Sequence, residues 1–420
     1  MDRFRIHGGT PLEGEIAISG AKNSALPALA ACLLTEEPVK LKRIPLVRDI
    51  GTMEKLLKYA GARVQIKDGV VTVCAEKLTR PEAPYDLVKT MRASSLVLGP
   101  LVARTGRARV SMPGGCAIGA RPINLHVSAL EQLGAEIKQA HGYVEAEVPH
   151  GLKGTLVQFD RITVTGTEDV LMAAVLADGE TLIQNAAREP EVQDLAELLN
   201  KMGARIEGAG TSTIHVEGVP KLHGAEHTVI ADRIEAGTFL IAGAMTRGDL
   251  VISDCMPEHL DALASKMRQA GAEVSTLRPG AMRVRATRRL DATDITTEEY
   301  PGFATDLQAQ YMAMMTLASG ISFITETIFE NRFMHALELA RMGANIRLEG
   351  RQAIVAGVED LTGAEVIASD LRASASLVLA GLVGRGQTLI DRVYHIDRGY
   401  EKIEEKLARV GARIERETKA

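Results

Sequence analysis

The chain has 420 residues, 46% of them hydrophobic and 25% charged, with a formal net charge of −5 at pH 7. This composition is ordinary for a soluble globular protein, and the negative balance excludes a protein drawn to nucleic acid or to an anionic membrane by bulk charge. The first residues lack the apolar core of a signal peptide, and the apolar runs are too short to span a bilayer. We therefore expect a cytoplasmic protein.

Taken in chain order, the predicted elements repeat as one unit, six times. In each copy an amphipathic helix ends in Gly-Ala-x-Val or Gly-Ala-x-Ile, and a short alternating run typical of a half-buried strand follows. The glycine is expected to stop the helix by adopting a positive φ. Successive copies lie 68 to 73 residues apart, which indicates one supersecondary unit repeated along the chain. The glycines are Gly61, Gly134, Gly203, Gly271, Gly343 and Gly411.

Each copy also predicts a second helix that is more apolar. These helices are apolar nearly all round, so we expect them to be buried. They are predicted over residues 24–34, 93–103, 169–177, 235–245, 306–318 and 374–383. The last five are expected to end at Gly106, Gly179, Gly248, Gly320 and Gly386, each followed by a strand.

Six copies predict an α/β protein of two domains with three repeats each, because a single core rarely grows past about 250–300 residues. We expect one domain over residues 22–230 and the other over residues 1–21 and 231–420, with the active site in the cleft between them. The strand-like runs at residues 4–6 and 15–18 precede the first copy. We expect them to complete the last copy of the second domain.

The second copy departs most from the repeat, in a glycine-rich loop over residues 112–122. This loop carries three glycines together with Cys116 and Arg121. One interpretation is a lid with a reactive thiol, since an adjacent arginine and a helix N-terminus lower the pKa of a thiol. The alternative is an ordinary connector with an incidental cysteine.

The other three cysteines, Cys32, Cys74 and Cys255, lie in apolar helix or strand contexts and are expected to be core residues. The sequence contains no CxxC pair, no Walker loop and no complete GxGxxG motif. It therefore predicts no metal and no cofactor.

Basic residues recur at the starts of helices in equivalent positions of the repeat. Equivalent positions share one end of a domain, so these side chains and the helix N-termini should converge where anions bind well. Such a set indicates a ligand with several negative charges. The residues are Lys22, Arg92 and Arg372 at the apolar helices, and Arg48, Arg121, Arg332 and Arg398 at the others.

Asp306 occupies in the fifth copy the place that Lys22, Arg92 and Arg372 occupy in theirs. A carboxylate among cations suits a general base or a ligand for a hydroxyl group. An equally good interpretation from the sequence is that Asp306 caps the helix that follows it.

Seven segments, spread over the chain in order, carry a resemblance to a known family. The most specific are the Pro-Gly-Gly-Cys run at 113–116 and the Phe-Glu-Asn-Arg run at 329–332; the others are residues 18–25, 91–94, 185–191, 300–308 and 369–373. In these segments the chain resembles the UDP-N-acetylglucosamine 1-carboxyvinyltransferases, the enolpyruvyl transferases of the first committed step of peptidoglycan synthesis. The resemblance implies two inside-out α/β barrel domains of three repeats each.

The resemblance also implies a reaction. The enolpyruvyl group of phosphoenolpyruvate passes to the 3′-hydroxyl of UDP-N-acetylglucosamine, and phosphate is released by addition–elimination through a tetrahedral ketal. Cys116 would be the general acid and would form a covalent adduct, and it would be the target of fosfomycin. Asp306 would accept the proton of the 3′-hydroxyl, while Lys22, Arg121 and Arg398 would clamp phosphoenolpyruvate.

The remaining positions that the resemblance implies are substrate contacts. They are Asn23, Arg92, Pro122, Ile123, Asn124, Leu125, Arg161, Ile162, Thr163, Val164, Ile328, Arg332, Asp370 and Arg372. Asn124 stands where many relatives carry aspartate. The implied partners are the two small-molecule substrates, without nucleic acid, membrane or an obligate protein partner.

Two alternatives to this function use the same scaffold. One is the shikimate-pathway enolpyruvyl transferase, which shares the donor but lacks the thiol loop. The other is a non-catalytic UDP-sugar sensor, which would have no use for Cys116, Asp306 and Lys22 together.

Overall fold

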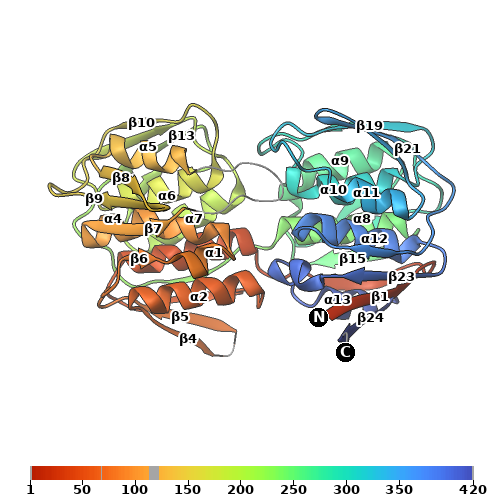
Figure 1. Ribbon diagram of the computed structural model, residues 1–420, viewed down its shortest axis with the longest axis horizontal. Coiled ribbons are helices and arrows are strands. Elements are labelled where there is room, and N and C mark those ends of the chain that lie inside the picture. The colour runs from red at the N-terminus through yellow and green to blue at the C-terminus, as the bar shows by residue number, and fades with distance from the viewer. Residues whose placement is uncertain (1, 68, 113–122, 419–420) are drawn as a thin grey trace. The chain divides into compact units, whose positions relative to one another are not determined.

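The computed structural model describes residues 2–67, 69–112 and 123–418. By its internal contacts the described chain divides into two compact units (Figure 1). One, here called the middle unit, comprises residues 20–112 and 123–230, and the other, the terminal unit, comprises residues 2–19 and 231–418. None of the helices formed by the described residues is both long and apolar enough to cross a membrane.

The middle unit contains three four-stranded sheets, of strand order β14-β3-β5-β4, β6-β7-β9-β8 and β10-β11-β13-β12. Its helices are α1 (Lys22–Ala31), η1 (Cys32–Leu34), α2 (Arg48–Ala60), α3 (Tyr85–Val88), η2 (Arg92–Val97), α4 (Leu98–Thr105), α5 (Asn124–Gln132), α6 (Val164–Ala174) and α7 (Pro190–Lys201). Its strands are β3 (Val39–Lys42), β4 (Arg63–Lys67), β5 (Val70–Cys74), β6 (Glu82–Ala83), β7 (Arg107–Ser111), β8 (Glu136–Ala140), β9 (Tyr143–Glu147), β10 (Leu156–Gln158), β11 (Glu180–Gln184), β12 (Arg205–Glu207), β13 (Thr213–Glu217) and β14 (Glu226–Thr228).

The terminal unit likewise contains three four-stranded sheets, of order β16-β17-β15-β2, β18-β19-β21-β20 and β22-β23-β1-β24. Its helices are α8 (Arg233–Met245), η3 (Pro257–Leu260), α9 (Asp261–Gln269), η4 (Thr305–Leu307), α10 (Gln308–Met315), α11 (His335–Arg341), α12 (Leu371–Val383), η5 (Val393–Arg398) and α13 (Ile403–Arg409). Its strands are β1 (Asp2–His7), β2 (Glu13–Ala17), β15 (Asp249–Ser253), β16 (Glu273–Arg278), β17 (Ala281–Arg285), β18 (Ile295–Thr296), β19 (Ile321–Thr325), β20 (Asn345–Glu349), β21 (Gln352–Ala356), β22 (Glu365–Ile367), β23 (Gln387–Asp391) and β24 (Arg413–Thr418).

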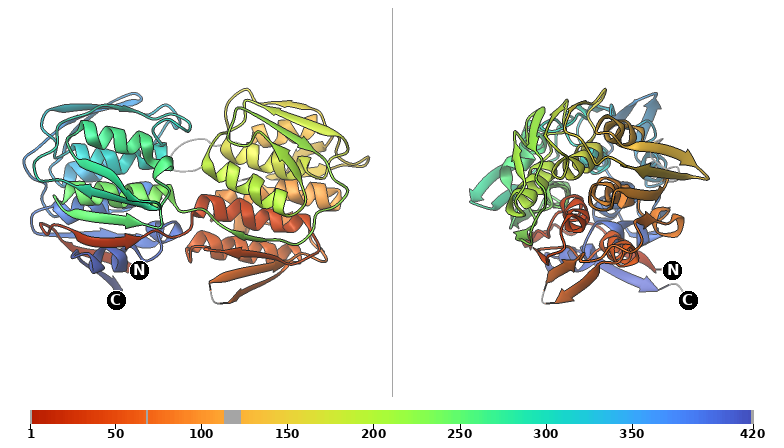
Figure 2. Two further views of the ribbon diagram at one scale, coloured as in Figure 1. Left: turned by 180° about the vertical axis from the view of Figure 1, so that it is seen from behind. Right: turned by 90° about the vertical axis from the view of Figure 1, so that its left-hand side faces the viewer.

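Every sheet repeats one pattern, which confirms the sixfold repeat seen in the sequence. An edge strand runs parallel to its neighbour, and that neighbour pairs with one strand of an antiparallel pair, as in β10, β11 and the pair β13–β12. The sheets lie on the outside of each unit and the apolar helices inside (Figure 2). In the terminal unit the helices α8, α10 and α12 contact one another in pairs, so the expected inside-out α/β arrangement is confirmed.

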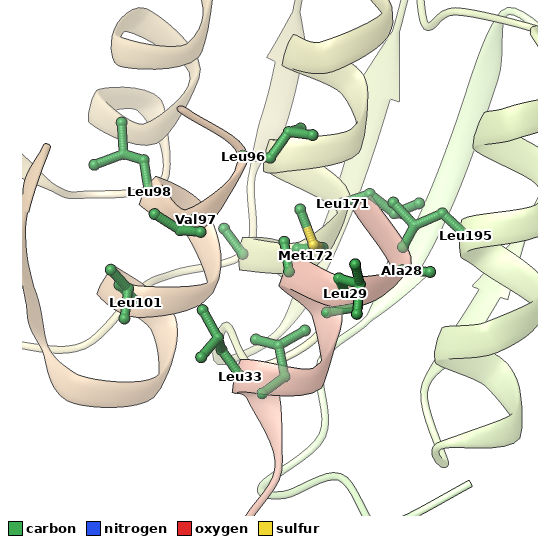
Figure 3. Close-up of a cluster of buried hydrophobic side chains, with 14 of the residues drawn as sticks. Ala28, Leu29, Leu33, Leu96, Val97, Leu98, Leu101, Leu171, Met172 and Leu195 are labelled. Atoms are coloured by element: carbon green, nitrogen blue, oxygen red, sulfur yellow. The ribbon is translucent and has the colours of Figure 1, made fainter. Parts of the chain in front are cut away.

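The core of the middle unit is built from the apolar helices (Figure 3). Ala28 and Leu29 of α1, Leu101 of α4, and Leu171 and Met172 of α6 are at most 1% exposed and belong to one buried cluster. The burial of these helices was predicted from the sequence because apolar residues occupy nearly every face of each helix. Their burial holds the N-termini of α1 and α6 at fixed places.

The first two strands join different sheets of the terminal unit. β1 lies between β23 and β24 in the sheet of the sixth copy, as predicted, with Asp2 opposite Thr418. β2 instead pairs in parallel with β15, in the sheet of the fourth copy. The prediction that both runs complete the last copy was therefore wrong for the second run. The repeat explains why, since each copy needs a parallel edge strand, and β2 is the one that precedes β15.

The six glycines that end the amphipathic helices all have positive φ, from 92° at Gly271 to 116° at Gly61, as predicted. Of the glycines after the apolar helices, Gly106 ends α4 directly. The other helices end three to five residues before the predicted glycine, at Ala174, Met245, Met315 and Val383. After α6 and α10 the final turn tightens to i→i+3 hydrogen bonds, such as Ala177 to Ala174 at 3.0 Å.

Two further details differ from the sequence analysis. The helix predicted over 93–103 is split, with η2 followed by α4, because Pro100 cannot donate a hydrogen bond and confines the α-helix to the residues around and after it. Cys32 and Cys255 are buried as predicted, but Cys74 is half-exposed. Cys74 shares the outer face of β5 with Val70 and Thr72, whereas Val71 and Val73 face the core.

Candidate active site

The predicted basic residues do lie at or just ahead of helix starts. Lys22, Arg48 and Arg92 are the first residues of α1, α2 and η2, and Arg372 is the second residue of α12. Arg332 lies three residues before α11, and Arg398 is the last residue of η5, ahead of α13. Cys116, Arg121 and Pro122 lie outside the described residues.

In the terminal unit, Asp306 is held between two arginines. Its Oδ1 accepts a hydrogen bond from Arg332 Nη2 and its Oδ2 from Arg372 Nη2, both at 2.7 Å. The two arginine side chains are 6% and 7% exposed, and that of Asp306 is 27% exposed. The site therefore presents one partly open carboxylate flanked by two buried positive charges.

This arrangement sets the ionisation of Asp306. Burial disfavours the charged carboxylate, but the adjacent guanidiniums of Arg372 and Arg332 outweigh it and hold the pKa of Asp306 well below its usual range. Asp306 is thus an anion throughout the neutral range. In this state it is a strong acceptor of hydrogen bonds and a weak acceptor of protons.

The helix-cap interpretation of Asp306 is contradicted by the structure. Asp306 is the middle residue of η4, and both of its carboxylate oxygens bond to arginines. Asp370 is the residue that acts as a cap, because its Oδ1 accepts the backbone N–H of Arg372 at 2.9 Å and of Ala373 at 3.0 Å. Asp370 therefore fixes the first turn of α12, which carries Arg372.

Arg332 is supported by a second set of polar groups. Its Nη1 donates to Thr305 Oγ1 at 2.8 Å, and the Thr305 hydroxyl donates to Glu326 Oε2 at 2.8 Å. Glu326 Oε1 accepts the backbone N–H of Ile328 at 2.9 Å and of Phe329 at 3.1 Å. Buried Glu326 thus ties the loop that carries Ile328 to the arginine beside Asp306.

In the middle unit, the start of α1 is fixed by buried polar contacts. Lys22 Nζ lies 3.2 Å from Asp49 Oδ2, in the first turn of α2. One residue past Asn23, the Ser24 hydroxyl bonds to Asp194, which also accepts from His227 Nε2 at 2.9 Å. These contacts orient Lys22 and Asn23 at the N-terminus of α1, where the helix dipole favours anions.

Two other predicted segments lie side by side in the middle unit. Ile123, Asn124 and Leu125 begin α5, and Arg161, Ile162, Thr163 and Val164 lead into α6. The Thr163 hydroxyl caps α6 by accepting the N–H of Gly166 at 3.2 Å. His126 of α5 joins the segments, with Nε2 3.1 Å from Thr165 Oγ1 and Nδ1 3.4 Å from Asp169 Oδ2.

The sequence analysis missed several polar residues of these clusters. They are Asp49, Asp194, His227, Thr238, Gln310, Glu326 and Tyr400. One signal was available, because Gln310 and Thr238 are polar residues within helices that are mostly apolar. Such residues need buried hydrogen-bond partners.

Comparison with known proteins assigns the family. Residues 6–407 match the family model described as EPSP synthase (3-phosphoshikimate 1-carboxyvinyltransferase). A UDP-N-acetylglucosamine 1-carboxyvinyltransferase of Solibacter usitatus is 70% identical over 99% of this chain and 100% of its own length. A protein of the same name from Myxococcus xanthus is 57% identical, with the same coverage.

Solved structures share the fold. The enolpyruvyl transferase NikO from Streptomyces tendae superposes with a TM-score of 0.89 at 26% identity, over 100% of this chain and 99% of its own. An EPSP synthase from Acinetobacter baumannii gives a TM-score of 0.76 at 20% identity over the whole of both chains, which shows the fold alone. The chain therefore belongs to the family of UDP-N-acetylglucosamine 1-carboxyvinyltransferases, within the EPSP synthase family of enolpyruvyl transferases.

Proposed function

We propose that this transferase moves the enolpyruvyl group of phosphoenolpyruvate to the 3′-hydroxyl of UDP-N-acetylglucosamine and releases phosphate, the first committed step of peptidoglycan synthesis. Full-length relatives at 57–70% identity that carry this activity in their names support it. The observation in the structure that carries the proposal furthest is the Asp306 carboxylate between Arg332 and Arg372.

The chemistry proceeds in two balanced steps. In the addition, the 3′-oxygen bonds to C2 of phosphoenolpyruvate while a general acid protonates C3 and the hydroxyl proton passes to a base. In the elimination, the bond from C2 to the phosphate oxygen breaks and C3 returns a proton. Cations stabilise the crowded ketal, which carries both carboxylate and phosphate.

We assign the base role to Asp306 and the acid role to Cys116. Asp306, as paired in the structure, is too weakly basic to take a proton readily. We infer that substrate anions draw Arg332 or Arg372 toward themselves, and the loss of a neighbouring positive charge raises the pKa of Asp306. The base would thus become active only when the substrates are bound.

Phosphoenolpyruvate is assigned to Lys22, Arg121 and Arg398, and the uridine diphosphate to Arg92 and the segments that begin α5 and α6. The buried contacts of Lys22 and the contact between His126 and Thr165 support this assignment, because they hold each group at a helix N-terminus. We place the reaction in the cytoplasm, where the free thiols of Cys32, Cys74 and Cys255 fit a reducing compartment.

One assay separates this function from its alternatives. Phosphate release is measured with phosphoenolpyruvate and either UDP-N-acetylglucosamine or 3-phosphoshikimate, and product mass is recorded. We expect phosphate release when phosphoenolpyruvate is combined with UDP-N-acetylglucosamine and none when it is combined with 3-phosphoshikimate. Release only with 3-phosphoshikimate would identify the shikimate-pathway enzyme. Binding of the UDP-sugar without any release would identify a sensor.

A further inference from the structure

Behind the Asp306–Arg372 pair lies a buried group of three polar side chains that the reaction as described does not use. They are Thr238 of α8, Gln310 of α10, and Tyr400, which follows η5. Thr238 and Gln310 are fully buried and Tyr400 is 2% exposed. Two helices and a loop of the terminal unit therefore bring polar groups to one point in an apolar core, where each group loses its contact with water.

The hydrogen bonds show what the group holds. The Tyr400 hydroxyl lies 2.8 Å from Thr238 Oγ1, 3.2 Å from Gln310 Nε2 and 3.5 Å from Arg372 Nη1. Thr238 Oγ1 lies 2.8 Å from the carbonyl of Ile234, to which it donates. With that hydrogen committed, the Tyr400 hydroxyl donates to Thr238 and its oxygen accepts from Arg372. Gln310 Nε2 has two hydrogens and three acceptors within reach: the Tyr400 hydroxyl, the carbonyl of Asp306, and Thr238 Oγ1 at 3.1 Å.

The group reaches both partners of the ion pair. Arg372 offers Nη1 to Tyr400 and Nη2 to Asp306 Oδ2, so the two contacts fix the plane of its guanidinium. Gln310 Nε2 also donates to the backbone carbonyl of Asp306 at 3.0 Å, which fixes η4. The buried polar group thus contacts both partners of the ion pair, Arg372 through Tyr400 and the backbone of Asp306 through Gln310.

We propose that Tyr400 is a positioning residue of the transferase, whose hydroxyl sets the orientation of Arg372 relative to Asp306. Burial raises the pKa of Tyr400, so the hydroxyl keeps its proton and serves as a neutral hydrogen-bonding group. Arg332 has a separate anchor in Thr305 and Glu326. Tyr400 therefore acts on one of the two arginines and not on the other. The proposal rests on the function proposed above.

The test compares two buried tyrosines of the same unit. Tyr400→Phe removes the hydroxyl that faces Arg372. Tyr311→Phe is the matched control, because Tyr311 is fully buried and its hydroxyl also bonds to a threonine, in this case Thr293, which is not among the hydrogen-bond partners of Asp306 or Arg372 given above. Phosphate release is followed with UDP-N-acetylglucosamine and phosphoenolpyruvate at pH 5 to 9, together with thermal unfolding.

For Tyr400→Phe we expect kcat to fall on the order of 10- to 100-fold, as for misplacement of a catalytic group, with little change in KM for the UDP-sugar. The acidic limb of its pH profile should shift toward neutral pH, because a loosened Arg372 lowers the pKa of Asp306 less than a fixed one does, although Arg332 stays in place. Tyr311→Phe should keep wild-type kcat and pH profile. Equal kinetic effects of the two variants would overturn the proposal.

A double-mutant cycle shows whether Tyr400 acts through Arg372. In an Arg372→Lys background, Tyr400→Phe should add almost nothing, since the guanidinium that it orients is gone. Additive losses would overturn the proposal. If Tyr400→Phe does not fold, Thr238→Val, which removes the acceptor of the tyrosine hydroxyl, takes its place in both experiments. A wild-type enzyme that releases no phosphate would instead count against the proposed function, which separates the two failures.

Discussion

At the scale of single residues, the decisive feature is an aspartate whose ionisation is controlled by its neighbours. Two arginines hold Asp306 as an anion, and each arginine has its own polar anchor. Asp306 can become more basic without any change of its own, because its pKa rises when either arginine moves away.

We predict that Asp306→Asn lowers kcat by about 10²–10⁴-fold, the range typical of a lost general base, while the affinity for UDP-N-acetylglucosamine changes little. Asparagine keeps the shape but cannot take the proton. Stability should also fall, because Arg332 and Arg372 lose their counter-charge. Turnover is therefore measured well below the melting temperature of the variant, and affinity by calorimetry. Turnover within a few-fold of wild type would remove Asp306 from the mechanism.

A second residue-scale prediction concerns His335, the first residue of α11, which is 1% exposed. Burial lowers its pKa to about 4 from an ordinary 6.5; nearby Asp370 opposes the shift and Arg332 adds to it. Between pH 6.5 and 4 the His335 imidazole is protonated in the unfolded chain but not in the folded protein. His335 should therefore cost the folded state up to about 3 kcal/mol as the pH falls through that window, and nothing at pH 7 and above.

The measurement is urea unfolding of wild type and His335→Gln at several pH values. Other buried groups titrate in the same window, including Glu235, whose pKa is raised to about 7 by burial. These groups contribute equally to both proteins, so their effect cancels in the difference between the two free energies of unfolding. The variant should gain stability relative to wild type as the pH falls from 7 to 4, and parallel curves would contradict the assignment.

The sequence located Asp306 and its arginines because the repeat places equivalent residues at one end of a domain. It could not show that Arg332 and Arg372 both contact Asp306, since they precede different kinds of helix and the contact depends on side-chain geometry. Tyr400 was missed for the same reason. Its partners Thr238 and Gln310 come from α8 and α10, which are brought together only by the packing of the apolar helices.

At the scale of elements, the amphipathic helix with its glycine stop is the most predictable part of the fold. All six glycines adopt the expected positive φ, because helical periodicity and helix termination are local properties of the chain. The ends of the apolar helices were less predictable. They depend on how the final turn packs, as in the i→i+3 bonds after α6 and α10.

The glycine stops should not be equally sensitive to substitution. At Gly134, φ is +96° and no described heavy atom lies within 4 Å of an added Cβ, so Gly134→Ala should cost only the backbone strain, about 1–2 kcal/mol. At Gly61, φ is +116° and the Cβ would lie 2.6 Å from the carbonyl oxygen of Lys77. Gly61→Ala should therefore cost more than Gly134→Ala in urea unfolding. Equal losses of unfolding free energy in the two variants would mean that the loop containing Lys77 moves aside without a measurable energetic penalty.

At the scale of the whole molecule, the two units are built alike but are connected differently. The described residues of the middle unit, 20–112 and 123–230, all lie between the two stretches that form the terminal unit, and β14 pairs with β3 to join the last of its strands to the first. The terminal unit takes β1 and β2 from the N-terminus and all its other strands from residues 249–418. The number of repeats in the sequence predicted two units of three repeats each. It could not assign β2 to its sheet, because a short edge strand carries too little pattern to choose between neighbouring copies.

We predict that residues 1–19 can be moved to the other end of the chain but not removed. A protein that begins at residue 20 and carries residues 1–19 after residue 420 should fold and keep phosphate release, because Asp2 already lies opposite Thr418. Deleting residues 1–19 should unfold the terminal unit, since two sheets lose a strand, while the middle unit stays folded. Circular dichroism and limited proteolysis check both variants. A deletion variant with wild-type proteolytic resistance would contradict the prediction.

The pairing of β1 with β24 also imposes an order on the making of the protein. β1 is made long before its partner β24, whereas every strand of the middle unit has been made once residue 228 is added. Domains generally fold as units during synthesis, so the middle unit should become protease-resistant earlier in synthesis than the terminal unit, which does so only once β24 has emerged. Until β23 and β24 have emerged, β1 remains without its partner strands, and an unpaired strand can associate with other chains.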